Sequence, residues 1–352
     1  MPVGGPIRTT PHALRLSVIS RRLEAMATRT TSRSAPVLVV VDPAARTQPA
    51  LDKAARIAAA TKSRLSVYAC DWREGVATQG RAASGMRRRL EADGLRALTE
   101  MVREHLGAGR RFTARFELGH PRAAHILAAV RRERPALVVV DSHFHAEARR
   151  ALFVAADWSL IRDCPAPLLY AKPGRWHAAP RIAAAIDPRH PADPRARLDA
   201  RLVSTARRYA RALDGSLYAV NAWLPLEPPA AGPVVFGLAL LDAPDAAGIV
   251  HAAEAAARAA IDRLLSDGGR PAAQVVLLRG AAVETLPGFA EVEGLDILVM
   301  GAVSRGWLYE ALVGATAERL LERLPCDVLV VNGARPRARA GAKQRAPRRF
   351  PV

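Results

Sequence analysis

The sequence predicts an α/β fold made of two tandem, doubly wound parallel sheets of five strands each. Three observations lead to this prediction. The chain has 352 residues, which is enough for two domains of ordinary size. Short apolar runs alternate with alanine-rich stretches of helical periodicity along most of its length. The runs also follow nearly the same rhythm in both halves of the chain, which indicates an internal duplication.

Ten apolar runs are the expected strands, five in each half. Their starts lie near Val37, Leu65, Phe112, Leu137 and Leu168, and then near Ile182, Leu217, Val275, Ile297 and Val328. Successive starts are 28, 47, 25 and 31 residues apart in the first half and 35, 58, 22 and 31 apart in the second. Runs such as VLVVV are apolar at every position, which is typical of strands buried on both faces of a parallel sheet.

Stretches of helical periodicity provide the connections that such a sheet needs. Apolar residues recur at helical spacing from Leu90 to Leu106 and again from Ala123 to Val130. Strand–helix–strand units of this length form right-handed, doubly wound sheets. Ligands bind these sheets beyond the carboxyl ends of the strands, where the strand order reverses. The first candidates for a site are therefore the residues that follow the strands, Asp42, Asp141, Asp187 and Gly301.

Most of the net charge of +19 lies in two terminal tails. Residues 1–34 and 333–352 together hold thirteen basic residues against one acid, Glu24, and so carry +12. Both tails have little that could form a core, so we expect them to be disordered and to bind polyanions without specificity. The N-terminal tail fits either a transit peptide or a start of translation upstream of the true one, at Met26.

The composition predicts a globular protein of the cytoplasm that does not enter the membrane. No apolar run approaches the roughly 18–20 residues that a bilayer span needs. The three cysteines, Cys70, Cys164 and Cys326, do not form a disulfide framework, and the last two are expected to pack as apolar residues. Motifs of the types Gly-x-Ser-x-Gly, Cys-x-x-Cys and His-Glu-x-x-His are absent from the sequence. We therefore expect no catalytic residues and no metal ligands.

Several segments resemble the universal stress protein family. They are VVVDPAARTQPALDKA (39–54), DWSLIRDCPAPLLYAK (157–172), GAVSRGWLYEALVGATAERLLERLPCDVLVV (301–331) and the third-strand turns ELGHP (117–121) and LRGAA (278–282). The similarity extends over about residues 36–332 and is to the tandem, E-type class of the family. It implies two Rossmann-like domains, related to those of adenine nucleotide α-hydrolases, at residues 35–173 and 180–332. It also implies that the two domains pack together like a homodimer of the family.

The same resemblance implies a nucleotide site that survives only in part, and only in the second domain. Members that bind ATP carry Gly, two residues, Gly, nine residues, Gly and then Ser, Thr or Asn. The glycines let backbone N–H groups approach the phosphates. Gly301 and Gly314 match the first and third glycines, whereas Ser304 replaces the second and Ala315 replaces the hydroxyl or amide residue.

The other residues of this expected site are Arg305, Thr316 and Asp187. Arg305 lies in the same turn, Thr316 offers a hydroxyl one residue late, and the resemblance places Asp187 beside the adenosine. In the first domain Asp141 stands at the first glycine position, and residues 141–158 contain no glycine. A carboxylate repels phosphate, so we expect no ATP there.

The insertion in the second half is another candidate binding region. Residues 223–250 are apolar but too rich in proline for a helix or a central strand. A long apolar loop normally packs over something. It could cover the crevice, dock on the other domain or bury a small apolar ligand.

From the resemblance we expect a non-catalytic protein that acts by binding and regulation and contributes to survival of stress such as DNA damage. No cofactor is required for that role. One alternative is weak binding or slow hydrolysis of ATP, with Mg²⁺, in the second domain. Another is a binder of a small apolar ligand under the 223–250 loop. The sequence leaves a homodimer open.

Overall fold

The computed structural model describes residues 35–71, 81–107, 109–119, 122–142, 155–188, 194–223, 246–266, 271–301 and 320–332. All of them belong to one compact unit that spans residues 35–352. Both basic tails, most of the insertion and residues 302–319 lie outside the described residues. What the sequence predicts for those segments therefore stays a prediction.

The first half of the chain forms a five-stranded parallel sheet. Its elements are β1 (Val37–Val40), α2 (Pro49–Ala60), β2 (Leu65–Asp71), α3 (Arg81–Leu106), β3 (Phe112–Leu118), α4 (Arg122–Glu133), β4 (Leu137–Asp141), α5 (Ala155–Asp163) and β5 (Leu168–Ala171). The strand order is β3-β2-β1-β4-β5, and every neighbouring pair is parallel. The order reverses between β1 and β4, which are buried along their whole length.

The second half repeats this path. Its elements are β6 (Arg181–Ala185), α6 (Pro194–Ala212), β7 (Ser216–Trp223), α8 (Ala246–Leu265), β8 (Ala273–Arg279), α9 (Ala282–Val292), β9 (Ile297–Gly301) and β10 (Asp327–Val331). The order β8-β7-β6-β9-β10 mirrors that of the first half, again with parallel neighbours. The prediction of two tandem α/β halves with five parallel strands each is confirmed.

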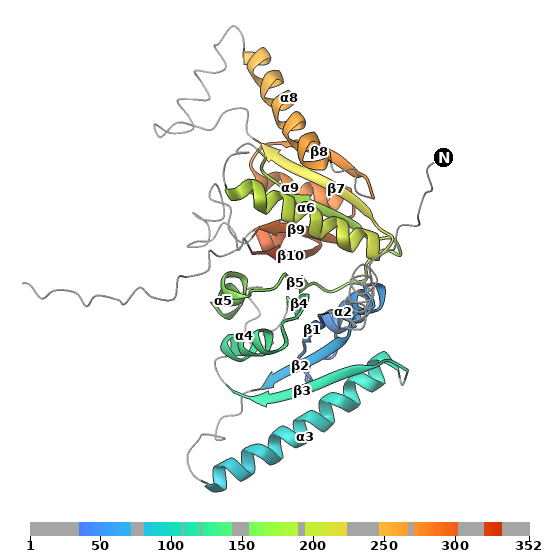
Figure 1. Ribbon diagram of the computed structural model, residues 1–352, viewed down its shortest axis with the longest axis vertical. Helices are drawn as coiled ribbons and strands as arrows, with labels where there is room; N and C mark the ends of the chain where they lie inside the picture. The colour runs from blue at the N-terminus through green and yellow to red at the C-terminus, as the bar shows by residue number, and fades with distance from the viewer. Residues whose placement is uncertain are drawn as a thin grey trace, which may run out of the picture. The chain divides into compact units, whose positions relative to one another are not determined.

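The two halves join edge to edge in one sheet of ten strands, labelled in Figure 1. The joint is an antiparallel pairing of β5 with β10, centred on Leu169 and Leu329. The sequence analysis predicts two sheets and does not predict this continuous one. Because β5 and β10 are antiparallel, the end of β5 lies beside the start of β10.

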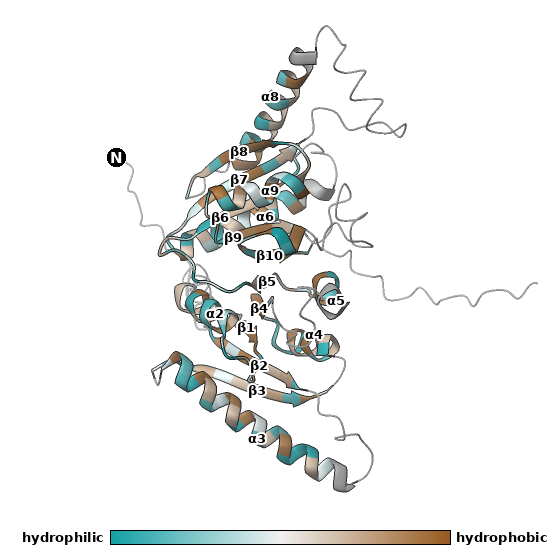
Figure 2. Ribbon diagram, turned by 180° about the vertical axis from the view of Figure 1, so that it is seen from behind, coloured by the Kyte–Doolittle hydropathy of each residue, from teal (hydrophilic) through white to brown (hydrophobic). Residues whose placement is uncertain are grey.

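Two apolar layers cover the two faces of the sheet. One layer contains buried residues of α2, α3, α6 and α8, such as Leu51 and Leu202. The other contains residues of α4, α5 and α9, such as Ile126 and Leu286. Successive residues of the central strands alternate between the layers, so both faces of these strands are buried, whereas the outer strands β3 and β8 are partly exposed. Figure 2 shows this pattern as brown central strands and a mixture of teal and brown along α3.

Two reciprocal contacts cap helix ends across the β5–β10 joint. The residue that directly follows the last strand of each half, Lys172 or Asn332, reaches the final helical carbonyls of the other half. The bonds join Lys172 Nζ to Leu321 O (2.7 Å) and Leu324 O, and Asn332 Nδ2 to Ile161 O (3.1 Å) and Cys164 O (2.6 Å). In both sets of bonds the two accepting residues have the same spacing along the chain. The joint therefore has the two-fold pattern of an isologous interface, in which each half makes the same contacts to the other.

The three cysteines are buried free thiols, as the sequence predicts. Burial raises the pKa of Cys164 to about 11 and that of Cys326 to about 12. A thiol that stays protonated at neutral pH is a poor nucleophile. Both side chains belong to the apolar layer that contains α4 and α5, which fits the packing role expected for them.

Candidate functional site

The strand order places the sequence-predicted residues at two equivalent points. In the first half β1 pairs with β4, so Asp42 and Asp141 follow neighbouring strands. In the second half β6 pairs with β9, so Asp187, just beyond the end of β6, and Gly301, at the end of β9, also lie at the ends of neighbouring strands. These are the two points where the strand order reverses and where doubly wound sheets bind ligands. The remaining predicted residues lie outside the described part of the chain: Ser304, Arg305, Gly314, Ala315 and Thr316.

The first-half site is filled by a carboxylate of the protein itself. Asp141 is only 8% exposed, and its Oδ1 accepts a hydrogen bond from the backbone N–H of Ala50 at 2.9 Å. Ala50 lies in the first turn of α2, and the N-cap residue Gln48 makes no side-chain cap bond. Asp141 therefore caps α2 from a distant strand and takes the position that an anionic ligand occupies at a helix N-terminus.

The loop between β1 and α2 is closed by its own polar groups. Asp42 Oδ1 accepts from the backbone N–H of Ala44 at 2.9 Å. Gln48 Nε2 donates to the carbonyl oxygens of Asp42 and Ala45, at 2.7 and 3.2 Å. Asp42 is thus used to shape the turn between β1 and α2.

The capping carboxylate should make the stability of the protein depend on pH. Burial raises the pKa of Asp141 to about 6 from an ordinary value of 3.8. A carboxyl with a raised native pKa holds its proton more tightly in the folded chain, so stability falls as pH rises from about 4 to about 6. Asp141→Asn keeps an oxygen for Ala50 but has no charge. We expect it to be more stable than wild type at pH 7, by up to about 3 kcal/mol.

Urea unfolding followed by circular dichroism between pH 4 and pH 7.5 measures this effect. The advantage of Asp141→Asn should be nearly complete at pH 7 and small at pH 4, where the wild-type carboxyl is protonated in the folded chain and about half protonated in the unfolded chain. A variant that is less stable at pH 7, or a difference that does not change with pH, would show that the carboxylate itself stabilises α2.

The corresponding position in the second half has no side chain. Gly301 ends β9, and a Cβ atom placed there would come within 2.8 Å of Leu198 Cδ2. Asp187 is half-buried just beyond the end of β6, and its backbone N–H donates to Asp199 Oδ1 at 3.3 Å. The described part of this site therefore has no capping side chain where the first half has Asp141, and Leu198 packs against the buried backbone of Gly301.

Two buried polar residues that the sequence analysis did not single out support this loop. Asp199 lies on α6 among apolar positions, and Asn221 interrupts the apolar run of β7. Asn221 is fully buried and donates through Nδ2 to the carbonyl of Ile186 at 2.8 Å. A polar residue inside an otherwise buried strand was the signal that could have identified it.

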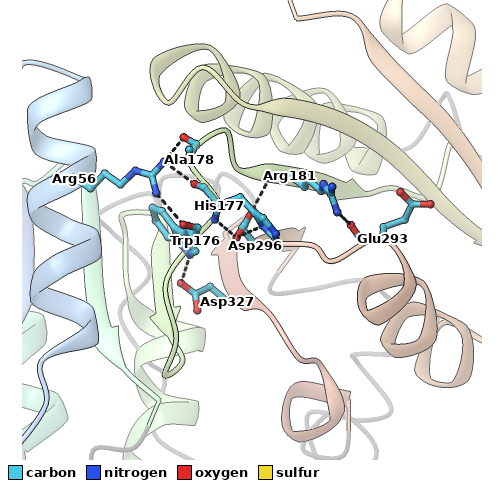
Figure 3. A network of polar contacts seen from close by, with 8 residues as sticks. All are labelled: Arg56, Trp176, His177, Ala178, Arg181, Glu293, Asp296 and Asp327. Carbon is cyan, nitrogen blue, oxygen red and sulfur yellow. Dashed lines mark hydrogen bonds and ion pairs between the residues drawn. The ribbon is translucent and has the colours of Figure 1, made fainter.

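A buried polar cluster lies where the two halves meet. Asp327, at the start of β10, is 2% exposed. Its Oδ1 accepts from Lys53 Nζ and from the backbone N–H of Lys172, both at 2.8 Å. Its Oδ2 accepts from Trp176 Nε1 at 2.9 Å, a contact drawn in Figure 3. Lys53 also donates to the carbonyl of Lys172 at 2.6 Å, so both buried charges have partners.

The segment that connects the halves, residues 172–180, is held from both sides. Arg56 of α2 donates to the carbonyl oxygens of His177 and Ala178, at 2.9 and 2.6 Å. From the second half, Asp296 accepts from the backbone N–H of His177 at 2.9 Å. Figure 3 shows Arg56 and Asp296 approaching this segment from opposite sides. The sequence analysis does not single out these residues and does not predict the contacts.

Comparison with known proteins identifies the family. The family described as the Universal stress protein family matches residues 34–172 and 181–332, one match for each parallel sheet. The chain belongs to the universal stress protein family. It is a tandem member, because the two matches follow one another in a single chain.

Relatives of this universal stress protein share its two-domain length. Universal stress protein E of Escherichia coli K12 is 25% identical over 312 residues, covering 84% of this chain and 93% of the relative. The Universal stress protein E homolog of Haemophilus influenzae is 23% identical over 305 residues, covering 84% and 96%. The chain is thus a stress-response protein similar to the E-type members.

Solved structures support the same fold. A protein of unknown function from Pseudomonas aeruginosa PAO1 has a TM-score of 0.60 at 24% identity, covering 85% of this chain and 93% of that one. A universal stress protein from Archaeoglobus fulgidus has a TM-score of 0.54 at 13% identity, covering 85% and 97%. Among the described residues, we find neither a helix long and apolar enough to cross a bilayer nor a group of three potential metal ligands.

Proposed function

We propose that this universal stress protein acts in the cytoplasm by reversible ligand binding and regulation, with a weak nucleotide site in its second half alone. The observation that supports the proposal is the difference between the two strand-order reversals. Asp141 occupies the helix N-terminus in the first half at 2.9 Å from Ala50. At the equivalent position of the second half, Gly301 has no side chain that could take the place of a phosphate, and a glycine allows the closest approach of a ligand to the backbone.

Binding without turnover is the form of action that these residues favour. Hydrolysis of ATP needs a residue that orients the attacking water as well as ligands for Mg²⁺. Asp187 is a carboxylate at this end of the sheet, and the family resemblance gives it the role of holding adenosine.

A role in survival of DNA damage is part of the same proposal. It would be tested by comparing survival of a deletion strain that carries wild-type protein or a variant unable to bind ATP.

Restoring the family pattern should tighten ATP binding. Ser304→Gly lets the backbone approach the phosphates, and Ala315→Ser returns a hydroxyl donor. One hydrogen bond to a charged group corresponds to about tenfold to a hundredfold in affinity. We expect calorimetry to show the double variant binding ATP at least about tenfold more tightly than wild type.

A phosphate-release assay on the same two proteins separates binding from hydrolysis. The proposal expects no release above the protein-free control, even where ATP is bound. A double variant that binds no better than wild type would assign the turn a packing role only. Phosphate release that saturates with ATP would establish the hydrolysing switch instead.

A further inference from the structure

A pocket of about 530 Å³ opens beside α2, apart from the two strand-end positions described above. One wall is a single face of α2, because its lining residues recur at helical spacing. The opposite wall is the start of the connecting segment, and Figure 3 shows Arg56 reaching from α2 toward that segment. The principal lining residues are Pro49, Asp52, Lys53 and Arg56 on α2 and residues 173–176 opposite. The other lining residues are Arg46, Thr47, Gln48 and His105.

Several charges that line the pocket are already neutralised or used. Lys53 faces the carboxylate of Asp327 at 2.8 Å. Asp52, the acid of this lining, lies 2.8 Å from His105 Nε2. The guanidinium of Arg56 is bonded to carbonyl oxygens of the connecting segment. These contacts account for the inner part of the pocket.

Two guanidinium groups in the lining stay free for a ligand. Arg46 and Arg175 both line the pocket and are exposed, and neither makes a hydrogen bond or ion pair with any part of the chain that the structure describes. They come from different segments, the loop before α2 and the connection between the halves. An unpaired arginine at the mouth of a cavity attracts anions, and two of them favour a doubly charged one.

We propose that this pocket binds a small organic molecule through a phosphate monoester held by Arg46 and Arg175. The planar guanidinium fork matches the oxygens of a phosphate, and a phosphate monoester carries close to two negative charges at neutral pH. A volume of about 530 Å³ lies within the range of small-molecule sites, so the pocket has room for the organic part as well. The site is independent of the nucleotide position proposed above.

Occupation of this pocket would join the two segments that carry the arginines. Arg175 directly precedes Trp176, whose indole N–H donates to Asp327 of the second half. Arg46 lies in the loop that leads into α2 of the first half. A phosphate bound to both side chains therefore fixes the connecting segment against the first half, and the folded chain gains stability from the ligand.

The test uses ribose 5-phosphate as the probe and ribose as its uncharged control, on the full chain. We expect calorimetry to detect the phosphate ester and not the sugar. The double variant Arg46→Ala/Arg175→Ala should bind about tenfold to a hundredfold more weakly, because the charge-assisted hydrogen bonds are lost. Both side chains are exposed and unpaired among the described residues, so the variant should keep the wild-type unfolding temperature.

A matched control removes two positive charges elsewhere. Arg88 and Arg89 are exposed on α3 and do not line the pocket. Arg88→Ala/Arg89→Ala should bind ribose 5-phosphate like wild type. The proposal is overturned if wild type shows no binding at millimolar probe. It is also overturned if both double variants weaken equally, since that assigns binding to net charge, or if Arg46→Ala/Arg175→Ala binds like wild type.

Discussion

Replacing Asp327 with alanine should lower the free energy of unfolding by about 3–5 kcal/mol. The carboxylate is 2% exposed and accepts from Lys53 Nζ, Lys172 N and Trp176 Nε1 within 2.9 Å. Alanine leaves the Lys53 ammonium, on a side chain that is itself buried, without its counter-charge. An uncompensated buried charge costs far more than the net contribution of the intact pair.

A double-mutant cycle separates the charge from the packing. Lys53→Met/Asp327→Asn removes both charges of the pair and keeps similar volumes, so it should lose much less stability than Asp327→Ala. Urea unfolding of wild type, Lys53→Met, Asp327→Asn and the double variant gives the coupling energy directly. A loss below about 1 kcal/mol for Asp327→Ala, no larger than that of an average substitution, would contradict the buried pair.

Truncating Trp176 should destabilise the chain by a similar amount, about 3–5 kcal/mol for Trp176→Ala. The side chain is 9% exposed and belongs to the apolar layer that contains α2 and α6. Its ring lies 5.6 Å from Lys53 Nζ and 5.7 Å from the guanidinium carbon of Arg56, distances that allow cation–π attraction. Alanine removes the packing, these contacts and the hydrogen bond to Asp327 together.

Trp176→Phe is the graded control for this prediction. It keeps an aromatic ring but lacks the indole N–H, so the loss should be limited to about 1–2 kcal/mol. Thermal and urea unfolding of the two variants compare the effects. Equal losses for alanine and phenylalanine would mean that the hydrogen bond, and not the packing, dominates.

Most strands could be predicted because they are dense apolar runs, whereas the outer strand β3 (FTARFEL) alternates apolar and polar residues. Val37, Leu65, Phe112, Leu137 and Leu168 are both the predicted starts and the observed first residues of β1 to β5. Burial on both faces removes the usual alternation and leaves a signal that is visible without the structure. The similar spacing of these runs in the two halves then predicts the internal duplication.

The joint between the halves could not be predicted in the same way. Pairing of β5 with β10 connects segments about 160 residues apart, and nothing in either run specifies the partner. Lys53 and Asp327 lie on amphipathic or apolar segments, where a single charged residue is normally expected to face the solvent. Their burial depends on a contact between halves that the local sequence does not encode.

The candidate site was predictable in position but not in detail. Asp42, Asp141, Asp187 and Gly301 follow central strands, and the strand order confirms that they flank the two reversals. That Asp141 caps α2 could not be read from the sequence, because the end of β4 and the start of α2 meet only in the folded chain. The glycine-turn residues beyond Gly301 stay a prediction.

The central claim is that the second half can bind a nucleotide, whereas in the first half a carboxylate of the protein occupies the equivalent position. A calorimetric count of the ATP sites tests this claim most directly. The titration is done on the Ser304→Gly/Ala315→Ser background, where binding should be tight enough to define the stoichiometry. We predict that one ATP binds per chain. Gly301→Asp places a carboxylate in the second half at the position of Asp141, and this variant should no longer bind ATP. An unchanged unfolding temperature would show that the variant keeps its fold. Two ATP per chain, or a Gly301→Asp variant that binds like its parent, would contradict the account.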